Sequence, residues 1–120
     1  MIVGIHHVQI TISPGAEEEA RAFYCRMLEL PEIRKPESLA GRGGFWVQAG
    51  DREVHIGVED GVERRLTKAH IAYEVDDLEL WKARLLAGGL PIYECPKIPG
   101  YDRVEFRDPF GNRVEFICRT

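Results

Sequence analysis

The strongest constraint on the fold is an internal repeat: the second half of the 120-residue chain reproduces the pattern of the first half. In each half, a segment with period-two alternation precedes an amphipathic helical segment, and further alternating segments follow. Equivalent positions recur at a nearly constant offset, because His70 follows His7 by 63 residues and Glu115 follows His55 by 60 residues. This order predicts two related modules, each built as a strand, a helix and three further strands.

The predicted modules cover about residues 1–60 and 67–120, and the polar segment 59–66, centred on Gly61, is the expected link between them. A chain of this length fits one domain, in which both modules contribute apolar residues to a shared hydrophobic core. The predicted class is therefore α+β, with eight mixed strands curled into a cup and the helices outside it.

Two segments have the spacing of amphipathic helices. The first lies within residues 13–31, and acidic residues crowd its first turn, where the helix dipole favours negative charge. Its apolar stripe is formed by Ala20, Phe23, Tyr24, Met27 and Leu28. The second lies within residues 76–91 and is predicted to begin at Asp76 with Glu79 three residues later, as in a capping box. Its stripe contains Leu78, Trp81 and Leu85, and Gly88 and Gly89 end it.

Strand alternation predicts which side chains lie opposite the helices. In residues 7–12 the apolar set is Val8, Ile10 and Ile12, so His7 lies on the other face. The same argument places one strong metal-ligating side chain on the uncovered face of each of four strands. These side chains are His7, His55, His70 and Glu115. A lone histidine on a strand face is usually a solvated polar residue, but three with a carboxylate favour a metal site.

Composition restricts the classes of partner. The chain has a formal net charge of −4, which argues against nucleic-acid binding because that function needs a basic surface. Its three cysteines form no CxxC pair, so a disulfide framework is not expected and a reducing cytoplasm fits best. No signal-peptide pattern or long apolar run occurs, so no membrane partner is expected. The predicted partner is a small-molecule substrate.

The repeat, the four ligand candidates and the stretch "FRDPFGNRVEF" at residues 106–116 resemble the vicinal oxygen chelate superfamily. This group includes glyoxalase I, fosfomycin-resistance thiol transferases, extradiol dioxygenases and bleomycin-binding proteins. The resemblance implies a divalent metal on His7, His55, His70 and Glu115. Glu115, or another carboxylate at the wall of the cup, is the expected catalytic proton carrier. The resemblance also implies that modules of two chains pair, so a homodimer is expected.

The resemblance leaves the reaction open. Glyoxalase I usually has a carboxylate where this chain has His55, whereas fosfomycin-type members use two histidines and one glutamate, which matches His7, His70 and Glu115 and leaves His55 as an extra. The favoured function is a metal-dependent glyoxalase-type lyase or isomerase that chelates two adjacent substrate oxygens. The alternatives are an antibiotic-inactivating thiol transferase and a non-catalytic protein that sequesters a drug. The metal, whether Zn, Ni, Fe, Co or Mn, is not specified by imidazole and carboxylate ligands.

Four further residues are predicted to contact substrate. Arg103 and Arg107 alternate with Val104 and Phe106, so they share the face of Glu115, where an arginine can clamp an anion. Gln9 lies on the face of His7, and Trp46 lies opposite its apolar neighbours Phe45 and Val47. A solvated strand face explains the arginines equally well, and a core or dimer contact explains Trp46. The segment "DPFGN" at 108–112 is predicted to be a hairpin turn without chemistry.

Overall fold

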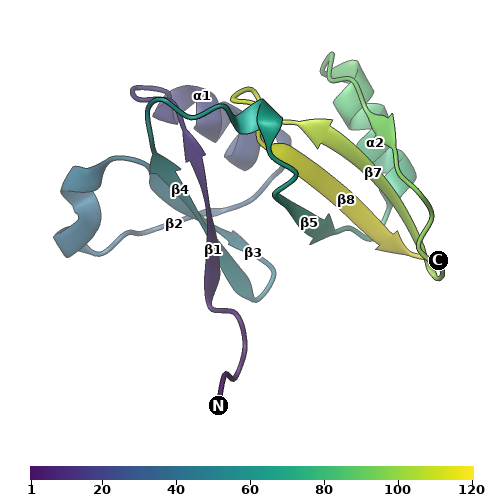
Figure 1. Ribbon diagram of the computed structural model, residues 1–120, viewed down its shortest axis with the longest axis horizontal. Helices are drawn as coiled ribbons and strands as arrows, with labels where there is room; N and C mark the ends of the chain where they lie inside the picture. Colours follow the sequence, from purple (N-terminus) through teal and green to yellow (C-terminus); the bar gives the residue numbers. More distant parts are fainter. The chain divides into compact units, whose positions relative to one another are not determined.

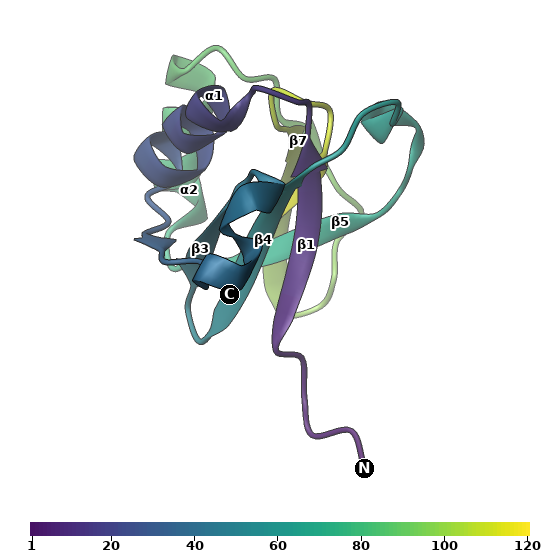
Figure 2. The same cartoon turned by 90° about the vertical axis from the view of Figure 1, so that its left-hand side faces the viewer.

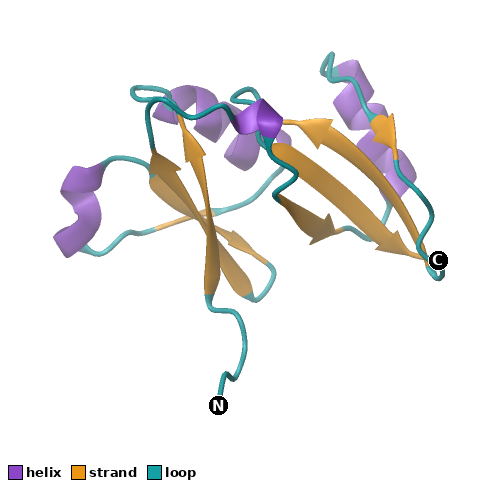
Figure 3. Ribbon diagram, in the orientation of Figure 1, coloured by secondary structure: helices purple, strands orange, loops and turns teal.

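The computed structural model describes all of residues 1–120, which divide into two compact modules, residues 1–62 and 63–120. Each module contains one four-stranded mixed sheet and few helices (Figures 1 and 3). The predicted α+β class with two modules is confirmed. Hydrogen bonds connect strands only within a module, so the eight strands form two sheets instead of one continuous sheet.

In the first module, β1 (His7–Ile12) runs parallel to β4 (Arg52–Val58), and the sheet order is β1-β4-β3-β2. The other strands are β2 (Glu32–Ile33) and β3 (Phe45–Ala49), both in antiparallel pairs. The helical elements are α1 (Glu17–Arg21), the π-helix η1 (Ala22–Met27) and the 3₁₀ helix η2 (Glu37–Arg42). Residues 1–6 extend away from the start of β1 (Figure 2).

The second module repeats this topology. Its sheet order is β5-β8-β7-β6, with β5 (His70–Glu74) parallel to β8 (Arg113–Arg119). The antiparallel strands are β6 (Tyr93–Glu94) and β7 (Tyr101–Arg107). The 3₁₀ helix η3 (Arg64–Leu66) precedes the sheet, and α2 (Leu78–Ala87) lies against β7 and β8 (Figure 1). The two modules thus have equivalent strand orders, as the repeat predicts.

The first helical segment departs from a regular α-helix after one turn. From Ala22 onward the backbone follows a π-helix, and the Leu28 N–H donates to the Phe23 carbonyl five residues back (2.9 Å). The apolar stripe is nevertheless retained, because Ala20, Phe23, Tyr24 and Leu28 are buried while Met27 is half-buried.

The second helix begins one residue later than predicted. Asp77, with extended backbone angles, is the N-cap, and its carboxylate accepts a hydrogen bond from the Leu80 N–H (3.0 Å). The N-cap assigned to Asp76 was therefore wrong, because Asp77 is the residue directly before the first helical turn and its side chain makes the capping hydrogen bond. Leu78 and Leu85 are buried and Gly88 caps the C-terminus, as predicted.

Alternation along the strands sets the core of each module. In β7 and β8 the buried side chains are Val104, Phe106, Val114 and Phe116, and in β3 and β4 they are Phe45, Val47, Val54 and Ile56. The predicted strand faces are confirmed at these positions. No helix has the length and apolar character that crossing a membrane requires.

Candidate functional site

In the second module, the structure brings together two of the predicted metal ligands. His70 begins β5, and Glu115 lies on the neighbouring parallel strand β8, directly opposite Ala72. The two side chains share a sheet face, and His70 Nε2 lies 3.2 Å from Glu115 Oε1. The Glu115 side chain is only 4% exposed, whereas that of His70 is 32% exposed. A carboxylate buried to this degree needs partners of opposite charge.

The hydrogen bond of His70 Nδ1 determines whether His70 Nε2 carries a proton or a lone pair. Nδ1 donates to the Lys68 carbonyl oxygen (2.9 Å), which can only accept, so Nδ1 carries a proton. In the neutral imidazole, Nε2 then presents a lone pair toward the Glu115 carboxylate. Two electron-rich atoms at 3.2 Å repel each other unless a proton or a cation lies between them. The pair is therefore suited to an imidazolium or to a shared metal ion.

Arg103 supports the same carboxylate from β7. Its Nη1 donates to Glu115 Oε1 (3.1 Å), while Nε and Nη2 both donate to the Pro96 carbonyl oxygen (3.0 and 2.7 Å). These bonds fix the guanidinium and, through it, the orientation of Glu115. Arg103 was predicted to bind substrate, and that role stays a prediction beside the contact observed here.

In the first module, three aromatic side chains stack on the face opposite the helices. The His55 ring lies between Trp46, at 3.7 Å between centroids with 2° between planes, and His7, at 4.0 Å and 15°. The three come from β3, β4 and β1, where register places Trp46 directly opposite His55. His55 is buried, whereas His7 is exposed.

The remaining contact of His55 is a carboxylate on its own strand. His55 Nε2 lies 2.9 Å from Glu53 Oε1, and this hydrogen bond is the main cause that lowers the pKa of the Glu53 carboxyl. An imidazole binds a metal through an in-plane lone pair. Because the rings of His7 and His55 are nearly parallel, their lone pairs do not converge on an ion between them. The assignment of His55 as a ligand stays a prediction that this geometry does not favour.

Gln9 and Trp46, two predicted substrate-binding residues, line a hollow of about 260 Å³ in the first module. Lys35 also lines it and donates to the Gly43 carbonyl oxygen (2.7 Å). The Gln9 side chain packs against Gly57, where a Cβ would lie 3.2 Å from the Gln9 amide carbon. The two predicted residues thus share one surface.

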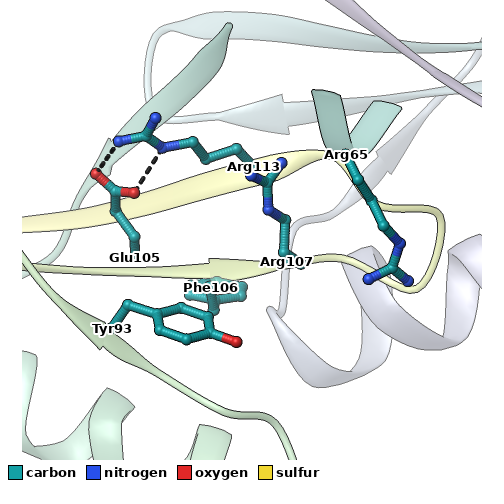
Figure 4. Close-up of a pocket in the computed structure, with 6 residues that line it drawn as sticks. All are labelled: Arg65, Tyr93, Glu105, Phe106, Arg107 and Arg113. Atoms are coloured by element: carbon teal, nitrogen blue, oxygen red, sulfur yellow. Dashed lines mark hydrogen bonds and ion pairs between the residues drawn. The ribbon is translucent and has the colours of Figure 1, made fainter. Parts of the chain in front are cut away.

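Arg107, the other predicted substrate-binding arginine, lines a larger hollow of about 480 Å³ in the second module (Figure 4). In this hollow Arg113 forms a two-bond ion pair with Glu105, both bonds being 2.5 Å long. This pair lowers the pKa of the Glu105 carboxyl, mainly through the hydrogen bond from Arg113.

The donor set of the second module fits a divalent cation. An imidazole nitrogen and a carboxylate oxygen lie 3.2 Å apart on one sheet face, and both are donor types that would hold a divalent cation. The bond from His70 Nδ1 to a carbonyl is the outer-shell arrangement that orients metal-binding histidines. Within neither module do three or more histidine, cysteine or acidic side chains gather as a metal site. The pair therefore needs further ligands.

Two features of the site escaped sequence reasoning. Glu53 lies two residues before His55 and on the same face, so alternation could have identified it as a partner. Arg65 gave no signal, because it precedes β5 in a segment that was predicted only to link the modules.

Comparisons with known proteins agree with this architecture. Residues 4–116 match the family model described as the Glyoxalase/Bleomycin resistance protein/Dioxygenase superfamily. The chain therefore belongs to this superfamily. No curated protein matches the chain significantly.

Among solved structures, a protein assigned to the glyoxalase family from Bacillus anthracis is 41% identical, with a TM-score of 0.93 over 100% of this chain and 98% of the other. The fosfomycin resistance protein FosX from Listeria monocytogenes, solved with Mn(II) and sulfate, is 20% identical, with a TM-score of 0.80 over 100% and 93%. Lactoylglutathione lyase from Agrobacterium tumefaciens is 20% identical, with a TM-score of 0.73 over 98% and 94%. At 20% identity the latter two support the fold alone.

Proposed function

We propose that this protein is a divalent-metal-dependent enzyme of the glyoxalase type, which binds its substrate through two adjacent oxygens. The observation that carries the proposal is the approach of His70 Nε2 to Glu115 Oε1 at 3.2 Å, with His70 Nδ1 already committed to a backbone carbonyl. That arrangement supplies one nitrogen and one oxygen donor that would hold a divalent cation. Membership in the superfamily supports the reaction class, and the metal in the FosX structure supports the cofactor by analogy.

In this proposal His70 and Glu115 hold the ion and His7 is a third ligand, supplied by the same chain or by a second copy. His7 is exposed at the start of β1, in the position equivalent to His70 in the second module. His55 is left outside the set, because Glu53 takes its Nε2 and aromatic rings cover both of its faces. This is the two-histidine, one-glutamate alternative that the sequence allowed.

A divalent ion bound there supplies Lewis acidity, which stabilises negative charge developing on a substrate oxygen. Glu115 is also the proposed proton carrier, because its second oxygen, Oε2, can accept a substrate proton while Oε1 faces His70. Arg103 positions this carboxylate by its bond to Oε1. The proposed setting is a cytoplasmic homodimer.

The proposal is tested by assaying isomerisation of a hemithioacetal by protein that has been treated with a chelator and then resupplied with Mn²⁺, Ni²⁺ or Zn²⁺. Activity should vanish on chelation and return with at least one metal, and Glu115→Gln should lower kcat by at least about a hundredfold. Glu74→Gln is the matched control, because Glu74 is an exposed carboxylate on β5 paired with Arg119. Ligand binding that is unaffected by the chelator, without turnover, would instead favour the sequestering protein.

A second candidate is an enzyme that inactivates an antibiotic by adding a nucleophile, as fosfomycin-resistance proteins do. It requires a cationic surface for a phosphonate, and the arginines lining the hollow of the second module provide one. Incubating the metal-loaded protein with fosfomycin and either a thiol or water separates the two candidates. Consumption of fosfomycin without hemithioacetal turnover would select this second function.

A further inference from the structure

The hollow of the second module contains more positive charge than its own carboxylate neutralises. Its volume is about 480 Å³, within the range of small-molecule sites, and it is lined by Arg65, Tyr93, Glu105, Phe106, Arg107 and Arg113. Glu105 is the only acidic residue in this lining, and both its oxygens are bonded to Arg113. Figure 4 shows this pair at one end of the hollow, Arg65 at the other end and Arg107 between them.

Arg65 and Arg107 are therefore cations without a carboxylate partner. Arg107 Nη1 donates to the Gly111 carbonyl oxygen (3.0 Å), which fixes the side chain without neutralising it. Arg65 forms no ion pair or hydrogen bond within the chain. In a chain of net charge −4, with twenty acidic residues to sixteen basic ones, two uncompensated arginines in one hollow are a local exception.

The hairpin turn at 108–112 holds the two arginines at this place. Gly111 has φ +99°, and a Cβ built on it would lie 2.8 Å from Arg65 Cγ. The absence of a side chain at Gly111 thus makes room for Arg65, while its carbonyl oxygen binds Arg107. The turn is itself rigid, because the buried Asp108 carboxylate accepts from the backbone N–H groups of Phe110 and Asn112 (2.9 and 2.8 Å).

We infer that this hollow, defined by Arg65 and Arg107, is a binding site for a small oxyanion, namely the carboxylate or phosphoryl end of a small molecule. Guanidinium groups match such oxyanions through paired N–H donors. The phenol of Tyr93, which is 56% exposed, adds a hydroxyl donor to the lining.

The hollow adjoins the candidate metal pair on the same sheet face. Register places Glu105 directly opposite Glu115, and Arg113 directly opposite His70. A substrate whose reacting oxygens lie at His70 and Glu115 can thus extend its anionic end toward Arg107. This role as a substrate subsite rests on the proposed function, whereas the oxyanion binding itself does not require a metal.

The site is tested by titrating chelator-treated protein, at low ionic strength and pH 7, with inorganic phosphate and separately with acetate, following backbone amide resonances. We expect saturable shifts at Gly111 and Phe106 with at least one of these anions, and the tighter of the two identifies the class of anion. Arg107→Gln and Arg65→Gln should each weaken binding about tenfold or more. Arg34→Gln, which removes the same charge from a side chain 86% exposed in the first module, should bind as the wild type does.

Two results would overturn the site: no saturation by either anion, or an equal loss in Arg34→Gln, which would indicate attraction to net charge alone. Arg65 is exposed, so its variant remains informative if Arg107→Gln does not fold. A His70→Ala variant separates this inference from the metal proposal, because it should bind the oxyanion as the wild type does whether or not the wild-type protein holds a metal.

Discussion

At the scale of single residues, Gly44 is the position where the backbone tolerates a side chain least. Its φ is +76°, and an added Cβ would lie 2.1 Å from the Ile56 carbonyl oxygen of β4. That carbonyl belongs to the strand that carries His55, so the approach of the η2–β3 loop to β4 depends on the missing side chain.

We predict that Gly44→Ala lowers the free energy of unfolding by more than about 3 kcal/mol, because it adds a backbone clash to the cost of a positive φ. Gly15→Ala is the control: Gly15 has φ +77° and nothing within 4 Å of the added Cβ, so its cost should be only about 1 kcal/mol. Urea unfolding of both variants measures the difference, and equal losses would contradict the clash.

The thiol of Cys95 gives a prediction about pH. Burial, followed by a hydrogen bond to the Glu105 carboxylate, raises the pKa of Cys95 to about 11. The reactive thiolate is therefore scarce at pH 9, and alkylation of Cys95 should accelerate with pH up to about pH 11. Glu105→Gln removes the carboxylate, lowers this pKa and should increase the labelling rate at pH 9 severalfold.

Iodoacetamide labelling between pH 7 and 11, read out by mass spectrometry of the Cys95 peptide, measures this rate. Glu94→Gln is the matched control, because this exposed carboxylate lies beside Cys95 in sequence and pairs with Lys82 (3.7 Å). A Cys95 that reacts at pH 8 as fast as a free cysteine, or more slowly in Glu105→Gln, would show that the carboxylate does not suppress the thiolate.

At the scale of secondary-structure elements, two neighbouring aspartates at the start of α2 are expected to contribute differently to stability. Asp77→Ala removes the side chain that accepts from the Leu80 N–H and should destabilise the protein by about 1 kcal/mol. Asp76→Ala removes an equal charge one residue earlier and should change stability by less than about 0.5 kcal/mol. Thermal unfolding compares the two, and a larger loss for Asp76→Ala would restore the N-cap predicted from the sequence.

The elements that the sequence predicts well are those with several buried positions. Apolar residues at helical or strand spacing predict which positions are buried. The structure confirms this for Leu78 and Leu85 in α2 and for Val104 and Phe106 in β7. The two-residue strand β2 and the π-helix η1 could not be predicted, because neither changes the apolar pattern enough to mark it. The N-cap of α2 was missed for a similar reason. Asp76 and Asp77 have the same side chain, so only the backbone conformation distinguishes which of them caps the helix.

At the scale of the whole molecule, the repeat predicts both the α+β class and the equivalent topologies of the two sheets. Alternation also predicts that His70 and Glu115 share a face, and the structure places them in contact. The stacking of His55 between Trp46 and His7 could not be predicted, because alternation gives the face of a side chain but not the orientation of its ring. His55 and Glu115 occupy equivalent positions in the two modules, but the repeat alone does not predict that their side chains make different contacts.

The most direct test of the central claim is the metal content of the purified protein after loading with Mn²⁺ or Zn²⁺ and desalting, measured by elemental analysis. The account predicts about one ion per chain in the wild type, at least about tenfold weaker retention in His70→Ala and Glu115→Gln, and unchanged retention in His55→Ala. Circular dichroism is the control that checks whether each variant is folded. Metal retained equally by wild type and His70→Ala, or by neither, would contradict the claim that His70 and Glu115 form a metal centre.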